Sequence, residues 1–318
     1  MKKYYSFLVV LSTLNIIAHN QPSTLIITSA YNQPEFLEFQ YRTFKKFLKE
    51  DFEFVVVDDS IEQHNTDAIK NICATFSLEY IRFPQDMHCR YLPYPSCPTA
   101  IASVRHAEVM QYGIDKCVLT HEGPVLIIDS DMFLIENFSV TDFLHGYHIA
   151  SYVRSAMELP SGLVPHKDKN FLWLGLVMFD TRTLPALSTF NTGIASLPGL
   201  WTDSGGNTYH YLKNNPDLKL RMIDLTNTHI ETVPQPVLIN FPGNNITHSQ
   251  IMNTQFLRDQ GVKELTINLL QSLNSGVQFL HGTTFLHYRA GSNWDGQSDQ
   301  FHIAKKLGLR EYIDKLVE

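Results

Sequence analysis

Several common signatures are missing from this chain, and each absence narrows its possible function. The four cysteines, Cys73, Cys89, Cys97 and Cys117, form no C-x-x-C pair, which argues against a zinc ribbon or a thioredoxin-like redox motif. No G-x-G-x-x-G sequence follows the first predicted strand, and no G-x-x-x-x-G-K-[ST] sequence occurs anywhere in the chain. The sequence therefore provides no dinucleotide-binding fingerprint and no P-loop.

The chain also lacks an excess of positive charge. Lys and Arg number 25 against 32 Asp and Glu, so the formal net charge is -7. A protein that binds nucleic acid as its main role needs a broad positive field that neutralises phosphates. We therefore expect no nucleic-acid partner. A small anionic ligand remains compatible with this composition, because a local cluster of cations is enough to bind it.

No apolar run is long enough to span a bilayer comfortably, since a spanning helix needs roughly 20 residues. The chain begins Met1-Lys2-Lys3, and the segment Phe7–Ala18 is mostly apolar. A short basic start followed by about a dozen apolar residues is typical of a secretory signal peptide. We expect residues 1–22 to be a signal peptide of an exported, secretory-pathway or periplasmic protein. A membrane anchor is the alternative, and residues 23–318 would then form the folded domain.

Export would give meaning to two further features. Cys89 and Cys97 could close a small loop by a disulfide in an oxidising compartment, with buried free thiols as the alternative. Sequons begin at Asn137 and Asn245, and they are glycosylated only if the host modifies exported proteins.

The chain does contain a regular alternation of apolar strands and amphipathic helices. Hydrophobic residues make up 44% of the 318 residues, enough for a sizeable core. Strands are predicted over residues 24–29, 54–57, 79–83 and 125–128, and helices over residues 34–48, 66–76 and from 98 to about 110. Asn32 is the predicted N-cap of the first helix, with Pro34 in its first turn. This alternation favours an α/β fold with a mostly parallel sheet flanked by helices.

Polar residues stand where three of these strands end. Asp129 and Asp131 follow the third of them, and residues i and i+2 of an extended segment point to the same side. Paired carboxylates suit a hard divalent cation such as Mn²⁺ or Mg²⁺, which often shares its oxygen ligands with phosphates. Thr28 and the pair Asp58-Asp59 end the other two strands. Because ligands of open parallel sheets bind beyond the carboxyl ends of the strands, we expect one site along this rim.

This layout resembles the glycosyltransferases of the GT-A fold. The likeness rests on the acids Asp58-Asp59, on the helix with Ser103–His106 that precedes the D-x-D sequence, and on the position of Asp129–Asp131 roughly a hundred residues after the first strand. The segment Leu172–Asp180 is similar to the later strand that carries a Gly beside the acceptor pocket in that family. The resemblance covers about residues 24–295 and implies one large domain with a C-terminal extension.

The resemblance also implies roles for individual residues. Asp131 would hold the metal directly, and Asp129 would contact the ribose or the metal through water. Thr28, the pair Asp58-Asp59 and Arg105 would contact the nucleotide sugar, since the guanidinium fork suits phosphate. For the two acids, ordinary turn chemistry is the alternative.

The segment Phe285–Trp294 is similar to the His-x-x-Gly-x-x-Lys-Pro-Trp motif of glycogenin-like retaining transferases, in which the His binds metal and the Lys binds diphosphate. By this likeness His287 is the third metal ligand. The spacing of the Gly and the Trp differs by one residue, and Asn293 replaces the Lys, so Arg289 would supply the missing cation. His281 is the competing ligand, and either histidine could instead be a hydrogen-bonded core residue.

The polar, glycine-rich segment Trp201–Asn207 stands where the fold often places an acid that binds the acceptor. Asp203 would be the general base of an inverting enzyme, or would only hold the acceptor in a retaining one. Trp173 and Trp201 are either platforms for sugar rings or residues of the core and rim.

The sequence therefore predicts a metal-dependent, hexosyltransferase-like enzyme. By family likeness the donor is a UDP-sugar, and the acceptor is a hydroxyl of an unknown glycan, lipid or protein. A catalytically silent, exported binding protein on the same scaffold is the first alternative. The second is a haloacid-dehalogenase-type phosphatase, whose D-x-D normally continues with Thr or Val near the start of its domain, whereas Met132 follows here.

Overall fold

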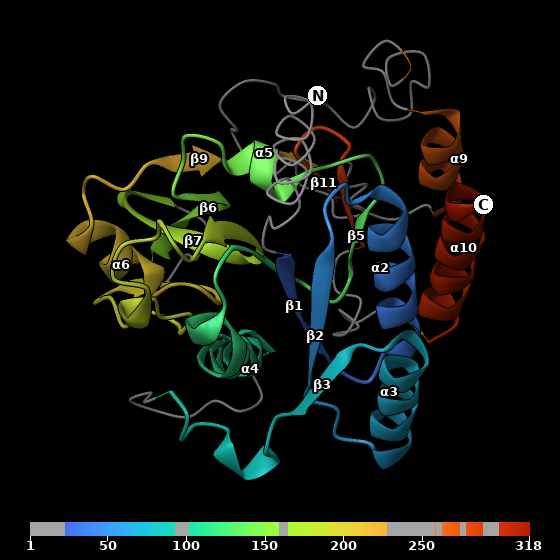
Figure 1. Cartoon of the computed structure of the whole chain (residues 1–318), viewed down its shortest axis with the longest axis horizontal. Coiled ribbons are helices and arrows are strands. Elements are labelled where there is room, and N and C mark those ends of the chain that lie inside the picture. Colours follow the sequence, from blue (N-terminus) through green and yellow to red (C-terminus); the bar gives the residue numbers. More distant parts are fainter. Residues whose placement is uncertain are drawn as a thin grey trace, which may run out of the picture.

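The computed structural model describes residues 23–92, 102–158, 165–227, 258, 263–273, 278–288 and 299–318. Its centre is a sheet of eight strands (Figure 1). The strands are β1 (Thr24–Ala30), β2 (Phe52–Asp58), β3 (Glu79–Arg82), β4 (Pro124–Ile128), β6 (Ile149–Glu158), β7 (Pro165–Asp180), β8 (Leu200–Trp201) and β9 (Leu220–Met222). They lie in the order β3-β2-β1-β4-β7-β6-β8, and β9 pairs with β6.

The direction of the strands divides the sheet into two parts. Strands β3, β2, β1 and β4 are parallel neighbours, whereas β7 is antiparallel to both β4 and β6. The chain leaves β1 toward β2 and β3 and then returns to β4 on the other side of β1. This reversal of strand order creates a topological switch point, where open α/β sheets bind ligands. The predicted α/β class and the predicted parallel strands are confirmed.

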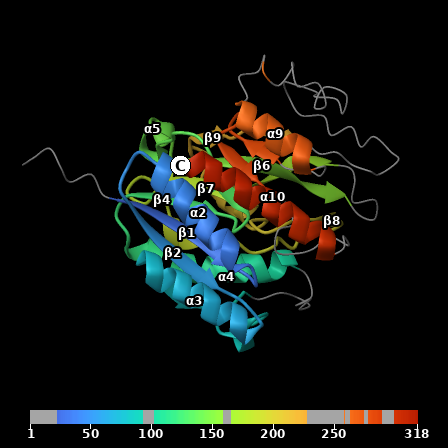
Figure 2. The ribbon, with the colours of Figure 1, turned by 90° about the vertical axis from the view of Figure 1, so that its right-hand side faces the viewer.

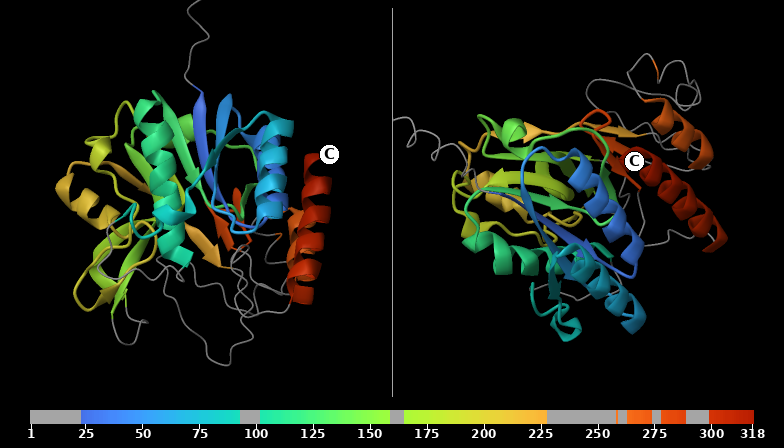
Figure 3. Two further views of the ribbon diagram at one scale, coloured as in Figure 1. Left: turned by 90° about the horizontal axis from the view of Figure 1, so that it is seen from below. Right: turned by 45° about the vertical axis from the view of Figure 1, so that its right-hand side comes forward.

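Helices cover both faces of the parallel strands. Helices α2 (Pro34–Phe47) and α3 (Gln63–Phe76) lie on one face, and α4 (Ala102–Cys117) lies on the other (Figure 3). Successive side chains of a strand point to opposite faces, so Ile26 packs on the α2 side and Ile27 on the α4 side. Strands covered on both faces need continuous apolar runs, which the sequence provides. The short helices α5 (Val140–Leu144) and α6 (Thr208–Asn214) lie beside the antiparallel strands.

A second, antiparallel sheet packs against α2. It consists of β10 (Leu225–Asn227), β11 (Gln278–Leu280), β12 (Phe285–His287) and β5 (Met132–Leu134), in that order. Helices α9 (Glu264–Leu273) and α10 (Asp299–Val317) complete this region, and α10 runs alongside α2 (Figure 2). Phe36 of α2 contacts Phe133 and Tyr288 in the core between them. The C-terminal region is thereby held against the segment that follows the D-x-D sequence.

The predicted apolar face of α2 is confirmed, because Leu37, Phe44 and Leu48 are buried, although the helix ends one residue before Leu48. The predicted N-cap is wrong. Gln33 occupies that position without a side-chain hydrogen bond, while Asn32 adopts a left-handed φ of 52°. The Asn32 Oδ1 instead accepts a hydrogen bond from the Ile61 amide at 3.1 Å, so this residue joins the loops after β1 and β2.

Three expectations concern export. Within the described residues no helix combines the length and apolarity needed to cross a bilayer, and residues 1–22 lie outside that part of the chain. Cys89 is disulfide-bonded, whereas its predicted partner Cys97 lies outside the described residues. Asn137 of the first sequon is exposed, and Asn245 of the second is also outside the described residues.

Candidate functional site

The fold brings three potential metal ligands together at the end of β4. Asp129, Asp131 and His287 each offer a ligand atom, and these atoms all lie within 4.8 Å of one another. The His287 Nε2 is 3.2 Å from the Asp131 Oδ1, and both side chains are buried. Because His287 of β12 pairs in register with Met132 of β5, strand pairing sets this proximity. Two carboxylates and one imidazole fit Mn²⁺, which accepts both oxygen and nitrogen ligands.

Two glutamines outside the triad hold its residues in place through hydrogen bonds. The Gln278 Oε1 accepts a hydrogen bond from the His287 Nδ1 at 2.8 Å, which leaves the Nε2 lone pair for a metal. The Gln40 Nε2 on α2 donates to the carbonyl oxygens of Asp129 and Met132, at 2.8 and 2.9 Å. These bonds fix both ends of the D-x-D segment. Neither glutamine belongs to a recognisable motif, and sequence reasoning missed both.

The competing histidine lies elsewhere. His281 is in the turn between β11 and β12, where its ring packs against Phe138 and Phe143 and its Nδ1 is 4.0 Å from Asp224. It is not part of the triad, so the geometry selects His287 over His281.

The carboxylates of the triad crowd each other electrostatically. Burial raises the pKa of the Asp129 carboxyl, the His106 ring opposes this rise, and the Asp131 carboxylate adds to it. The His106 Nε2 on α4 lies 3.2 Å from the Asp129 Oδ1, and its Nδ1 is 3.3 Å from the Ser204 Oγ. A divalent cation would relieve the repulsion between the two acids.

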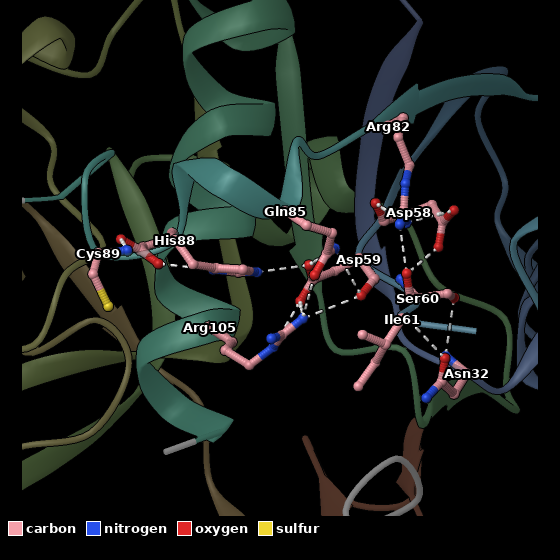
Figure 4. Close-up of polar contacts among 11 residues, drawn as sticks. Asn32, Asp58, Asp59, Ser60, Ile61, Arg82, Gln85, His88, Cys89 and Arg105 are labelled. Atoms are coloured by element: carbon pink, nitrogen blue, oxygen red, sulfur yellow. Dashed lines mark hydrogen bonds and ion pairs between the residues drawn. The ribbon is translucent and has the colours of Figure 1, made fainter. Parts of the chain in front are cut away.

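A second cluster lies at the end of β2, where Asp59 holds Arg105 (Figure 4). The Asp59 Oδ2 accepts hydrogen bonds from the Arg105 Nε and Nη2, at 3.1 and 2.8 Å. The guanidinium also stacks 5.2 Å from the Tyr31 ring centroid, a cation–π contact. The Asp59 Oδ1 accepts from the Gln85 Nε2 at 2.7 Å and lies 2.8 Å from the His88 Nε2. Two predicted residues, Asp59 and Arg105, therefore act as a unit, together with three residues that the sequence analysis missed.

The neighbouring acid faces the opposite way. Asp58 is fully buried, and its oxygens accept from the Ser60 amide at 2.8 Å and the Tyr80 hydroxyl at 2.9 Å. Arg82 pairs with it at 3.0 Å. Figure 4 shows Asp58 and Arg82 on the other side of Asp59 from His88 and Arg105. Asp58 therefore anchors the end of β2.

Thr28 and Arg289 are the other two predicted nucleotide contacts. Thr28 is buried in β1, and its hydroxyl lies 3.4 Å from the Ser29 carbonyl. Arg289, the predicted replacement for the missing Lys, lies outside the described residues.

Asp203 is engaged by a partner that the sequence did not reveal. Its Oδ2 forms an ion pair with Arg154 of β6, and its Oδ1 accepts from the Ser204 amide at 2.8 Å. Its charge also raises the pKa of the Asp129 carboxyl. One of the two carboxylate oxygens of Asp203 is therefore already bound to a guanidinium.

The two candidate tryptophan platforms differ in environment. Trp173 is buried in the core, with its ring 5.3 Å from that of His287. Trp201 is 38% exposed on β8. The core interpretation therefore holds for Trp173, and only Trp201 is open to a ligand.

Comparisons with known proteins find similar solved structures, all at low sequence identity. No protein-family model matches the chain, and no curated protein matches it. The mannosyltransferase PcManGT from Pyrobaculum calidifontis, in complex with GDP-Man and Mn²⁺, is 12% identical with a TM-score of 0.40, covering 94% of this chain and 73% of that one. The galactosyltransferase LgtC, in complex with donor and acceptor sugar analogues, is 13% identical with a TM-score of 0.37, covering 62% and 72%.

The bifunctional glycosyltransferase WbbM is also similar, at 11% identity and a TM-score of 0.35 over 54% of this chain. The chain spans about a third of the length of WbbM, because the match covers 34% of it. TM-scores of this size do not carry a functional assignment, which therefore rests on the geometry of the site.

Proposed function

We propose that this chain is a metal-dependent glycosyltransferase that moves a sugar from a nucleotide-diphosphate donor to an acceptor hydroxyl. The observation that carries the proposal is the triad of Asp129, Asp131 and His287, whose ligand atoms lie within 4.8 Å of one another. Asp129 and Asp131 follow β4, which pairs with β1 at the topological switch point of the sheet.

The triad would hold Mn²⁺ or Mg²⁺, and such a cation acts as a Lewis acid that neutralises charge developing on a diphosphate leaving group. The chain's own residues do the remaining work. Gln278 orients His287, and Gln40 fixes the D-x-D segment. Arg105, held by Asp59, supplies a fixed positive charge on the nucleotide side.

Several finer features belong to the same proposal. The donor is a UDP-sugar by resemblance to the family, and Asp203 holds the acceptor, because Arg154 already occupies one of its oxygens. The acceptor is a glycan, a lipid or a protein. The disulfide at Cys89 supports an exported protein, since disulfides persist in oxidising compartments.

The test is thermal melting of the full chain with UDP, GDP, CMP or ADP, each with Mn²⁺ and with EDTA. A ligand that binds only the folded state raises the melting temperature. We expect one of the nucleotides to raise the melting temperature with Mn²⁺ but not with EDTA. We expect Asp131→Asn to abolish this rise. Asp67→Asn, which changes an exposed acid of α3, is the matched control and should keep the shift.

Two outcomes contradict the proposal. No shift with any nucleotide in Mn²⁺ would favour a catalytically silent binding protein on this scaffold. If a nucleotide still raises the melting temperature in EDTA and in the Asp131→Asn variant, then donor binding does not require the metal.

A further inference from the structure

One buried histidine joins the nucleotide side of the proposed site to a second acid. His88 follows the short 3-10 helix Gln85–Met87, and its side chain is almost entirely buried. Its Nε2 lies 2.8 Å from the Asp59 Oδ1, and its Nδ1 lies 2.9 Å from the Glu108 Oε2. The ring also packs 4.6 Å from that of Phe83, which fixes its plane. His88 therefore bridges two carboxylates (Figure 4).

The geometry decides the charge of this ring. An ionised carboxylate only accepts hydrogen bonds, so a ring that bonds a carboxylate through each nitrogen must donate from both. Only the imidazolium can do so. Burial lowers the pKa of His88, but the hydrogen bonds to Asp59 and Glu108 and the charge of Asp59 raise it, and the net direction is upward.

The charges around the bridge balance when His88 is protonated. Asp59 from the end of β2 and Glu108 from α4 are the facing acids, and Arg105 from α4 is the facing base. Tyr91 and Tyr112 reach the ring only through Phe83. With a neutral His88, one of two buried acids would lose its cation, which is costly in a protein interior.

The bridge also limits how Asp59 can move. The Asp59 Oδ1 is shared by His88 and Gln85, and its Oδ2 binds Arg105 through two nitrogens. Glu108 is itself fixed, because its Oε1 accepts from the amide of Cys89 at 2.7 Å. A chain of contacts therefore runs from Glu108 of α4 through His88 to Asp59. From Asp59 it continues to the Arg105 guanidinium, which stacks on the Tyr31 ring.

We propose that His88 is a positioning residue for donor binding: as an imidazolium it ties Asp59 to Glu108 and so holds Arg105 in place for the nucleoside diphosphate. This inference rests on the proposed function for the ligand, but the bridge itself is a property of the folded chain. Loss of the proton or of the ring should loosen Arg105 and weaken nucleotide binding, while the metal triad stays intact.

The first experiment measures Kd for UDP and for GDP in saturating Mn²⁺ from pH 6 to 9. Wild-type protein should bind the accepted nucleotide with a Kd that rises as His88 loses its proton. His88→Gln should weaken binding about tenfold, the loss of one hydrogen bond to a charged group, and should remove that step in the pH profile. Affinity for Mn²⁺ alone should be unchanged.

His64→Gln, which replaces an exposed histidine of α3, is the matched control. An unchanged Kd and pH profile in a folded His88→Gln protein would overturn the inference.

The second experiment needs neither a variant nor a nucleotide. In ¹⁵N-labelled wild-type protein, we expect both ring nitrogens of His88 to be protonated at pH 7, and the Arg105 Nε resonance to move as His88 titrates. A neutral His88 ring at pH 7, or an Arg105 resonance that ignores its titration, would overturn the positioning role. If the bridge titrates as expected but no nucleotide binds, the proposed function fails and the bridge stands.

Discussion

At the scale of single residues, the proposed metal site depends on a side chain that holds no metal. Gln278 accepts from the His287 Nδ1, and this one bond selects the tautomer whose Nε2 faces Asp131. The Trp173 ring limits the other movement of the imidazole, because it packs 5.3 Å away. Without Gln278, the ring would be free to change its tautomer and its tilt.

We therefore expect Gln278→Ala to lower Mn²⁺ affinity about 10- to 100-fold, the usual effect of losing such a partner. Mn²⁺ binding followed by electron paramagnetic resonance measures it directly. Gln63→Ala, which removes an exposed glutamine of α3, should leave the affinity unchanged. Equal Mn²⁺ affinity in the Gln278 variant and wild type would mean that His287 is not oriented in this way.

The bridge at His88 predicts a stability that depends on pH with a definite sign. The folded state raises the pKa of His88 above its usual value of 6.5, so the protonated ring stabilises the folded state. This contribution is complete below that usual value, and it is lost as the pH rises through the raised pKa. We expect His88→Gln to lower the free energy of unfolding by about 2 kcal/mol at pH 6 and by less at pH 9.

Urea unfolding of the wild-type and His88→Gln proteins from pH 6 to pH 9 measures this difference. The difference between wild type and His64→Gln should stay small at every pH, because His64 is exposed. A His88→Gln penalty that is the same at pH 6 and pH 9 would show that the imidazolium adds nothing to folding.

The sequence predicts the proposed metal ligands better than the residues that support them. Asp129 and Asp131 stand in a short local pattern, and His287 stands in a motif-like segment, so each carries its own signal. Gln278 and His88 are single polar residues that belong to no motif, and the partners of His88 lie 20 and 29 positions away. Glu108 did carry a signal. It lies four residues after Val104, on the apolar side of α4, where an acid needs a buried partner.

At the scale of elements, the sequence predicts strands more readily than their directions. The ranges predicted for β1, β2, β3 and β4 agree with the structure to within a few residues. The antiparallel course of β7 was not predicted, because a fully buried strand is an apolar run in either direction. Pairing of β7 with both β4 and β6 is decided by long-range contacts, which no local pattern records.

The loop that carries Asp203 is held to β7 by a glycine. Gly205 has a φ of 90°, and a Cβ added there would lie 2.1 Å from the Leu172 carbonyl oxygen. Its amide also donates to the Thr192 carbonyl at 2.6 Å, which keeps the backbone close. An alanine at this position would have to move the loop, and with it the pair of Asp203 and Arg154.

We expect Gly205→Ala to lower the free energy of unfolding by about 3 kcal/mol or more, since backbone strain and overpacking add together. Gly146→Ala is the matched control, because Gly146 has a similar φ of 80° but nothing within 4 Å of an added Cβ. That variant should lose only about 1–2 kcal/mol, from the left-handed backbone alone. Chemical denaturation compares them, and equal losses would refute the steric role assigned to Leu172.

At the scale of the whole molecule, the proposed metal site joins the two sheets. Asp129 follows β4 of the main sheet, Asp131 precedes β5 of the second sheet, and His287 ends β12 in the opposite half of the chain. Two backbone bonds flank this junction. The Tyr288 amide donates to the Asp131 carbonyl at 2.8 Å, and the Ile135 amide donates to the Thr284 carbonyl at 2.9 Å. A bound cation would therefore act as a cross-link between segments that strand pairing and core packing already hold together.

This arrangement predicts where Mn²⁺ stabilises the protein, and hydrogen exchange can locate it. At a free Mn²⁺ concentration of about 100 times its Kd, the site should gain about 2.7 kcal/mol. The amides of Ile135 and Tyr288 should then exchange about 100-fold more slowly, if they open together with the junction. Amides of α3, which lies away from the second sheet, should be slowed less, because they also open locally. Asp131→Asn should abolish the effect while its apo exchange pattern stays close to that of wild type. Equal slowing in α3 and at the junction would mean that the cation opposes only global unfolding, and the junction would then not be a separate opening unit.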